Sequence, residues 1–180
     1  MPARTSPGCG RPARRGLDRD SMRRHRVTRV LPFTPDQLFQ LVGDVPAYPQ
    51  FVPWITSMRV TNLRADPDVS TLDAEAGVGF SLLRERFATR VIRDSRTREI
   101  TTDLLRGPFR HLHNSWKFEP HPDGCLVVFD IEFEFRSRIL DALLHANFDR
   151  AVDKLIGCFE ERARALYARD TQAPPRPSTL

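Results

Sequence analysis

The segment from Val45 to Trp54, VPAYPQFVPW, holds three prolines and three aromatic residues in ten positions. Each proline fixes its own φ angle, removes a backbone donor and disfavours the α conformation of the residue before it. The segment therefore cannot be a long helix or a central strand, and we predict an apolar connector with one helical turn around 48–52. Because such a loop is costly to leave in water, it should cover the core or line a hydrophobic mouth, which favours a binding cavity over a catalytic cleft.

Composition and charge limit the class of protein. The 180 residues suit one domain, and no apolar run approaches the roughly 20 residues that span a bilayer. The net charge of +5 comes from the first 26 residues, which hold eight arginines against two aspartates, whereas the rest holds 20 basic and 21 acidic residues. A body this close to neutral argues against a nucleic-acid-binding domain, and we expect no DNA partner.

The two ends of the chain differ in composition from the central part. We assign residues 1–24 to a disordered basic tail, 25–169 to one domain and 170–180 to a disordered tail. The first 21 residues lack the apolar stretch of a secretory signal, and a disordered extension or a true start at Met22 both remain open. Three widely separated cysteines, Cys9, Cys125 and Cys158, indicate neither a metal site nor a disulfide framework. We expect a cytoplasmic protein.

Periodicity predicts the element order. A strand over 27–31 is followed by a short helix that begins with a Thr34 cap and Pro35. Alternating apolar residues then predict an antiparallel meander, because only short turns separate its segments. The predicted strands cover 55–64, 70–82, 84–94, 98–106, 110–119 and 125–136. From 138 to 169, apolar residues at three- and four-residue steps predict one long amphipathic helix.

This order implies an α+β fold in which a curved antiparallel sheet wraps around one helix. In the last predicted strand, Val127, Phe129 and Ile131 share the inner face, while Asp130 and Glu132 share the other. The strand over 70–82 carries small residues on its inner face. Small side chains opposite a helix leave volume unfilled, so we predict a cavity between the sheet and the helix.

Several motifs occur in order along the chain. They are Val45-Pro-x-Tyr-x-x-Phe-Val-Pro-Trp54, Leu83-x-Glu-x-Phe87 with Val91, Gly107-Pro-Phe-x-x-Leu112 with Asn114 and Trp116, Phe129-x-Ile-x-Phe-x-Phe135, Phe148, and Phe159-Glu-x-Arg-Ala163. With them, the chain from Val27 to Leu166 resembles the coenzyme Q-binding START-domain family and its bacterial relatives, the ribosome association toxins, within the polyketide cyclase-like superfamily.

The resemblance implies a START-like helix-grip fold, a seven-stranded curved antiparallel sheet wrapped on a long C-terminal helix with an internal apolar tunnel. In the quinone branch the tunnel holds ubiquinone or a similar isoprenoid lipid, as a non-catalytic chaperone for respiratory electron transport and ubiquinone biosynthesis. That branch implies no further cofactor, and either a free protein or one peripheral on the inner face of the respiratory membrane. The other branch implies binding to a ribosomal subunit. An aromatic polyketide cyclase or dehydratase is the third alternative.

The expected ligand contacts combine the connector, inward positions of the strands and the final helix. They are Tyr48, Phe51, Val52, Trp54, Val78, Phe80, Glu85, Phe87, Phe109, Leu112, Asn114, Trp116, Phe129, Ile131, Leu144 and Phe148. We expect no catalytic residue and no metal site, because the sequence carries no nucleophile elbow, phosphate-binding loop or dinucleotide fingerprint.

Some of these residues allow two interpretations. Glu85 shares strand parity with Phe87, so it either contacts a quinone carbonyl or sits at a rim paired with an arginine. Asn114 and Trp116 either present donors to a ligand or satisfy structural roles. His111 and His113 share a face with each other, opposite that of Asn114, and should lie in solvent.

The arginines of the central hairpins, from residue 84 to residue 110, allow two interpretations as a group. They form a solvated outer face, or they attract anionic lipids or ribosomal RNA.

Overall fold

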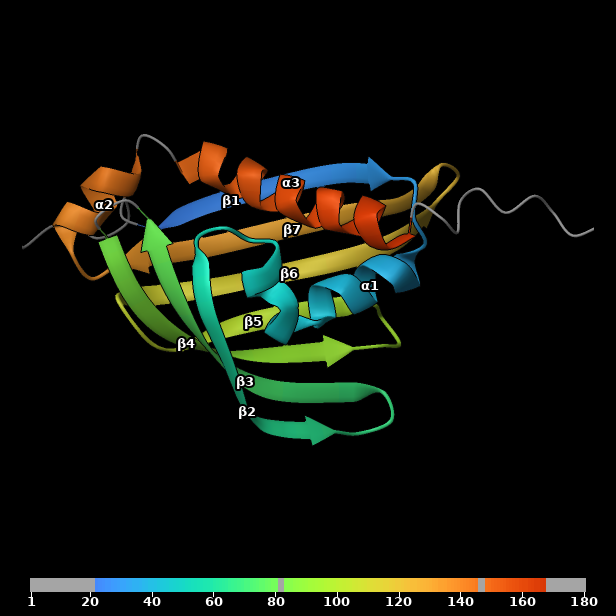
Figure 1. Cartoon of the computed structure of the whole chain (residues 1–180), viewed down its shortest axis with the longest axis horizontal. Coiled ribbons are helices and arrows are strands. Elements are labelled where there is room, and N and C mark those ends of the chain that lie inside the picture. Colours follow the sequence, from blue (N-terminus) through green and yellow to red (C-terminus); the bar gives the residue numbers. More distant parts are fainter. Residues whose placement is uncertain (1–21, 81–82, 146–147, 168–180) are drawn as a thin grey trace, which may run out of the picture.

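The computed structural model describes residues 22–80, 83–145 and 148–167, without the side chains of Phe80, Leu83 and 143–145. Seven strands form one antiparallel sheet in the order β1-β7-β6-β5-β4-β3-β2 (Figure 1). The strands are β1 Arg23–Leu31, β2 Ile55–Ala65, β3 Val69–Phe80, β4 Leu83–Asp94, β5 Glu99–Arg106, β6 Phe109–His121 and β7 Gly124–Phe135. The helices are α1 Pro35–Gly43, the 3₁₀ helix η1 Val45–Gln50, α2 Arg138–His145 and α3 Phe148–Tyr167. The predicted fold class is confirmed.

The connector between β1 and β2 crosses the concave face of the sheet. Helix α1 begins with a capping box, in which Thr34 Oγ1 accepts from the Gln37 amide at 3.2 Å and Gln37 Oε1 accepts from the Thr34 amide at 2.9 Å. The proline-rich segment forms η1, so its helical turn begins at Val45 and not at the predicted residue 48. A 3₁₀ helix tolerates these prolines because it is short and several of its N–H groups need no internal partner.

Strand register sets which side chains face inward. On β7, Phe129 stands opposite Trp116 of β6, and Ile131 stands opposite Asn114. Phe129 is buried against the helices. The apolar residues of β7 that alternate with its carboxylates therefore face the concave side, as the sequence predicts.

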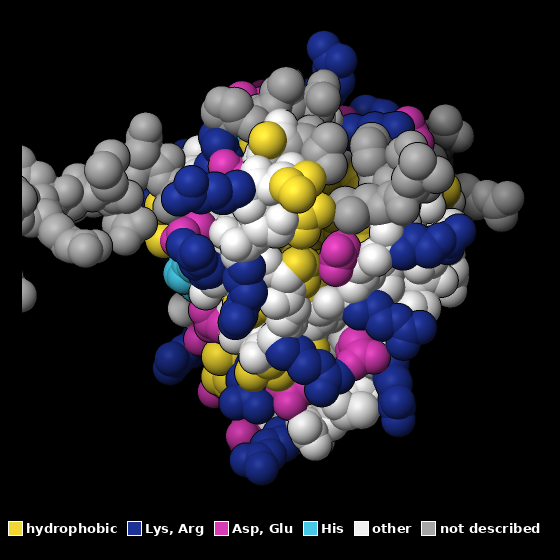
Figure 2. All heavy atoms as spheres, turned by 90° about the vertical axis from the view of Figure 1, so that its left-hand side faces the viewer, with side chains coloured by type: hydrophobic (Ala, Val, Ile, Leu, Met, Phe, Trp, Pro, Cys, Tyr) yellow, Lys and Arg dark blue, Asp and Glu magenta, His cyan; other side chains and the backbone are white. Residues whose placement is uncertain are grey.

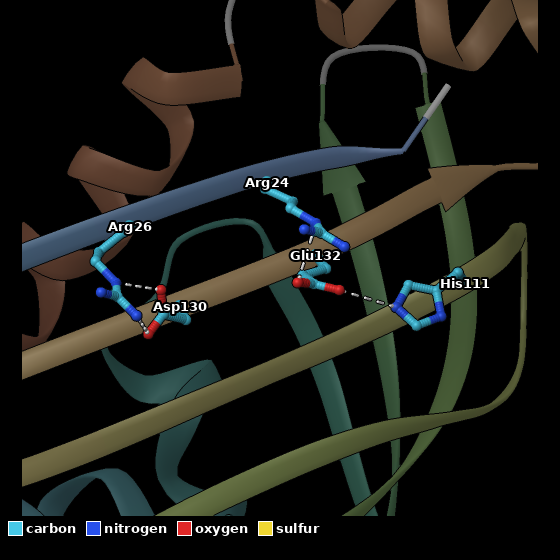
Figure 3. A network of polar contacts seen from close by, with 5 residues as sticks. All are labelled: Arg24, Arg26, His111, Asp130 and Glu132. Atoms are coloured by element: carbon cyan, nitrogen blue, oxygen red, sulfur yellow. Dashed lines mark hydrogen bonds and ion pairs between the residues drawn. The ribbon is translucent and has the colours of Figure 1, made fainter. Parts of the chain in front are cut away.

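Strand β1 begins at Arg23, earlier than the predicted start at residue 27. Its outward arginines are held by carboxylates of β7, with Arg24 Nε 3.1 Å from Glu132 and Arg26 Nε 2.6 Å from Asp130 (Figure 3). These cross-strand pairs extend the strand beyond its apolar part. Most of the predicted disordered tails, 1–24 and 170–180, lies outside the described residues.

The prediction of one helix over 138–169 is wrong, because the structure has two helices, α2 and α3, that cover different surfaces. Leu140 of α2 is buried at the end of β7, whereas α3 buries Val152, Ile156, Phe159 and Ala163 against the concave face. In Figure 1, α3 lies along β1 and β7, and α2 lies beyond its N-terminal end, at the left of the picture. None of the described helices has the length and apolar character needed to cross a bilayer.

Candidate ligand-binding site

One half of the concave face, which we call the packed half, is filled by aromatic rings. Trp116 lies 4.3 Å from Phe129 and 5.2 Å from Phe159, measured between ring centroids. Tyr48 and Phe51 each approach the Phe159 ring edge-on at 5.1 Å. Trp116, Phe129 and Phe159 are all buried, so this half resembles an ordinary protein core.

The connector closes the packed half. The Tyr48 hydroxyl donates to the Val42 carbonyl at 2.6 Å, and burial raises the pKa of this phenol above its ordinary value. Val52 has no exposed surface, whereas Trp54 is partly exposed with Lys154 Nζ 5.6 Å from its ring centroid. Tyr48, Phe51 and Trp54 are all partly exposed, and ligand contacts from this segment stay predictions.

The opposite half ends in a second group of rings, which we call the aromatic end. It consists of Phe87, Phe109, Phe133, Phe135 and Phe148, from the start of β4, the start of β6, the end of β7 and the start of α3. The ring centroids of Phe87 and Phe109 are 5.4 Å apart, those of Phe109 and Phe135 are 4.8 Å apart, and those of Phe133 and Phe148 are 4.2 Å apart. Phe133 is buried, but the other four rings are partly exposed.

A glycine allows the strands to converge at the aromatic end. Gly107, between β5 and β6, has a φ of +149°, and a Cβ there would lie 2.5 Å from the Phe87 Cβ. Only glycine combines this backbone conformation with so close an approach. The Gly107-Pro-Phe motif therefore positions Phe109 against Phe87.

Between the two ring groups, a row of inward-facing side chains keeps exposed surface. The row runs across β7, β6 and β5 through Ile131, Asn114 and Thr102, which are paired in register. The flanking inward residues of β6 and β7 are buried, namely Trp116, Phe129, Leu112 and Phe133. A densely packed interior would bury the row as well. We call this partly exposed inner surface the chamber; an apolar tunnel above it is consistent with this packing and stays a prediction.

Three inward-facing polar groups, at the edge of the chamber and near the tip of the β3–β4 hairpin, form no hydrogen bond or ion pair within the described residues. Within the described residues, neither the Asn114 amide nor the Trp116 indole nitrogen makes a hydrogen bond, although both residues face inward. Glu85 faces inward too, opposite Val78 in register, and is partly exposed. The predicted rim pair between Glu85 and an arginine does not occur in the described part of the chain. Asn114 and Glu85 are partly exposed and therefore accessible to a ligand, whereas Trp116 is buried in the packed half and borders the row.

The remaining predicted site residues divide into three groups. Val78 and Phe87 lie on the inner face near the tip of the β3–β4 hairpin, and Leu112 lies beneath the aromatic end with 7% of its surface exposed. The side chains of Phe80 and Leu144 lie outside the described part.

Sequence reasoning missed Thr102, Phe135 and His25. His25 Nδ1 is 3.0 Å from Asp149, and its ring meets Phe148 edge-on at 6.2 Å. The register places His25 opposite Ile131. The alternation of His25 with Val27 could have revealed its inward position, had the first strand been extended.

The convex face of the sheet carries many ion pairs. Arg90 Nε lies 2.9 Å from Asp73, and its hydrogen bond, with one from Asn62, holds the pKa of that carboxyl below its usual value. His113 Nδ1 lies 2.7 Å from Asp103, and His111 lies 3.8 Å from Glu132 (Figure 3). The predicted outward position of both histidines is confirmed.

A groove of about 480 Å³ borders the packed half between α1, β2, β3 and the end of α3. Arg93 lines it, lying over Gly43 at the C-terminal end of α1 and 5.2 Å from the Phe39 ring centroid. A cation at this helix end is stabilised by the helix dipole and by the ring. Structural packing therefore accounts for Arg93.

Comparisons with known proteins agree with this architecture. The family described as "Polyketide cyclase / dehydrase and lipid transport" matches residues 31–160. The ribosome association toxin RatA of Rickettsia prowazekii is 36% identical over 140 residues, which cover 76% of this chain and 93% of that protein. The mitochondrial coenzyme Q-binding protein COQ10 homolog B of Xenopus laevis is 32% identical over 148 residues, covering 79% of this chain and 58% of that protein.

Among solved structures, the 18 kDa protein CC1736 from Caulobacter crescentus is 62% identical, with a TM-score of 0.70 over 81% of this chain and 99% of that one. The resemblance seen in the sequence motifs is thereby confirmed. The chain belongs to the polyketide cyclase/dehydrase and lipid transport family, on the START-like branch that includes RatA and COQ10 relatives.

Proposed function

We propose that the chain binds ubiquinone, or a similar isoprenoid quinone, in the chamber and acts as a non-catalytic lipid carrier that supports respiratory electron transport and ubiquinone biosynthesis. The observation that carries this proposal is the partly exposed row of Ile131, Asn114 and Thr102 between buried neighbours. A lipid-transport family and a coenzyme Q-binding relative support it.

Apolar burial supplies most of the expected affinity. A few isoprene units that bury a few hundred Å² contribute on the order of 5–10 kcal/mol at about 25 cal/mol per Å², before the costs of association. The partly exposed rings of Phe87, Phe109 and Phe148 offer such a surface. A flexible chain gains this energy without a precise fit, so the length of the isoprenoid tail should matter less than its apolarity.

The polar groups supply selectivity for the head group. The Asn114 amide and the Trp116 indole can donate hydrogen bonds to quinone carbonyls, as few polar groups among many apolar ones do in ligand pockets. Glu85 can act similarly when it is protonated or bridged by water. Replacing Glu85 with Gln tests this role, because unchanged quinone retention would remove Glu85 from the site.

A ribosomal partner is the second candidate. Its support is that the RatA relative is covered over 93% of its length, whereas the COQ10 relative is covered over 58%. The convex face offers little to RNA, however, because its basic side chains are largely matched by carboxylates, as in the Arg26–Asp130 and Arg90–Asp73 pairs.

A cyclase or dehydratase is the least supported alternative. It needs an acid–base pair at the chamber. Among the described histidines, His25 with Asp149 is the pair at the aromatic end, but the Asp149 side chain is 78% exposed to solvent, and His113 pairs with Asp103 on the convex face.

The proposal is tested by native mass spectrometry after detergent-free purification and by titration of the apoprotein with ubiquinone, followed by tryptophan fluorescence. We expect one quinone per chain and saturable quenching, since Trp116 borders the chamber. Asn114→Leu should weaken binding roughly three- to tenfold by removing a donor. Its matched control, Ser115→Ala, faces the convex side and should bind normally. A chain that neither co-purifies with nor is quenched by quinone would overturn the proposal.

A further inference from the structure

Unpaired arginines gather at the aromatic end. Arg84 and Arg86 near the start of β4, Arg136 after β7, Arg138 on α2 and Arg150 on α3 are all exposed. Within the described residues, none of the five forms an ion pair with a carboxylate; Arg136 donates to the Phe109 carbonyl at 2.8 Å. This end is therefore basic although the body as a whole is near neutral.

These arginines lie at the same end of the molecule because the elements that carry them converge there. The ring contacts from Phe87 to Phe109 and from Phe109 to Phe135 connect the start of β4 with β6 and with the end of β7. Arg23 Nε lies 3.2 Å from Asp141, which connects α2 with β1. Figure 2 views this end of the molecule: a hydrophobic strip runs down its middle, and Lys and Arg side chains lie on both sides.

An aliphatic side chain projects from the same end. Ile139, on the outward face of α2, is 74% exposed, while its neighbour Leu140 is buried. Exposed Ile139 is flanked by Arg138 and lies close in sequence to Arg136. A helix with an outward aliphatic residue next to cations is suited to the interface of a bilayer, where the apolar group inserts and the guanidinium groups stay among the headgroups.

We infer that this end docks on a membrane rich in anionic lipid, with Ile139 inserted and Arg84, Arg86, Arg136, Arg138 and Arg150 over the headgroups. Charge complementarity selects this partner: among the described carboxylates of this end, Glu85 faces inward, Asp149 contacts His25 and Asp141 pairs with Arg23, so the five arginines are not matched by carboxylates. RNA would use the arginines but gain nothing from the exposed Ile139 or the apolar strip. The consequence that the chamber then opens toward the bilayer rests on the function proposed above.

Vesicle flotation with the full chain tests the inference, using quinone-free vesicles of phosphatidylcholine alone or mixed with phosphatidylglycerol. We expect binding to the mixed vesicles that weakens as salt rises. The double variant Arg84→Gln/Arg86→Gln should bind about 25-fold more weakly, since each arginine contributes about fivefold. Ile139→Ser should bind about tenfold more weakly through lost apolar burial.

A matched control lies on β2, away from this end. Leu63 is 67% exposed and Arg64 is exposed without an ion pair, so Leu63→Ser/Arg64→Gln removes the same chemistry elsewhere. The control should float like the original chain. Equal binding to both kinds of vesicle, no effect of the arginine variant, or equal losses in the control would overturn the inference. Binding to ribosomal RNA that depends on the arginines but not on Ile139, without flotation, would overturn it in favour of nucleic acid.

The test separates this inference from the proposed function. Quinone uptake from detergent micelles requires the chamber but no vesicle, whereas flotation of quinone-free protein requires the docking surface alone. Quinone uptake without flotation would contradict the docking surface and leave the proposed carrier function intact. Flotation without quinone uptake would contradict the carrier function and leave the docking surface intact.

Discussion

The two halves of the concave face are built on the same strands but are filled differently. On β7, Phe129 is 2% exposed in the packed half, while Ile131, two residues further, keeps accessible surface in the chamber. Both face inward in the same register. The difference comes from the cover, because Trp116 packs on Phe129, and Phe159 of α3 with the connector rings packs on Trp116. Cavities in such folds therefore depend on what lies over the sheet more than on the strands.

The largest expected effect is a difference in stability between side-chain truncations in the packed half and in the chamber. Phe129→Ala should lower the free energy of unfolding by about 3–5 kcal/mol, since it leaves a cavity among closely packed rings. Ile131→Ala should cost less than about 2 kcal/mol, because part of its side chain is already unburied. Urea denaturation of both variants provides the measurement, and equal losses would show that no chamber distinguishes the halves.

The pH dependence of stability tests whether the Cys125 thiol is buried in the packed half. Burial raises the pKa of Cys125 to about 11, whereas an unfolded thiol titrates near 8.5. Between these values the unfolded chain loses the proton and the folded chain keeps it, so stability should fall as pH rises from about 8.5 to 11, by up to about 1.4 kcal/mol per unit. Unfolding measured across this range should show a flatter slope for Cys125→Ala. An unchanged slope would mean that the thiol is not shielded from water.

Gly107→Ala addresses the aromatic end. The substitution strains a φ of +149° and drives a Cβ toward Phe87, so we expect a loss of about 1–3 kcal/mol. Because the strain falls on the Phe87–Phe109 contact, NMR shifts should be larger at these rings than at Trp116. Shifts spread evenly over both halves would contradict the separation.

The smallest expected effect is a gain in stability from helix propensity alone, at a glycine of α3 where an added methyl group makes no packing contact. A Cβ at Gly157 of α3 would meet no atom within 4 Å, so Gly157→Ala should raise the free energy of unfolding by about 0.5–1 kcal/mol. Thermal unfolding checks this gain. A loss would indicate a neighbour that the present arrangement of α3 does not contain.

Local patterns predict the sheet well and its cover poorly. Strict alternation from Val127 to Phe135 identifies the inner face of β7, and the Thr34 cap marks the start of α1. The division between α2 and α3 escapes prediction, because both helices share one apolar period although they pack on different surfaces. The exposure of Asn114 escapes it too, since parity shows only that the amide faces inward and not whether anything lies over it. His25 is missed because the residues around it at the start of β1 are arginines, which give no apolar alternation to mark a strand.

Isotope-edited NMR of the ¹³C-methyl-labelled chain with a short-chain ubiquinone tests the central claim most directly. We predict intermolecular NOEs to the methyl groups of Ile131 and of Leu104, which lies two residues from Thr102 on the same face of β5 and is partly exposed. We predict none to Val127 in the packed half or Val128 on the convex face. NOEs confined to Val128, or none at saturating quinone, would contradict that claim.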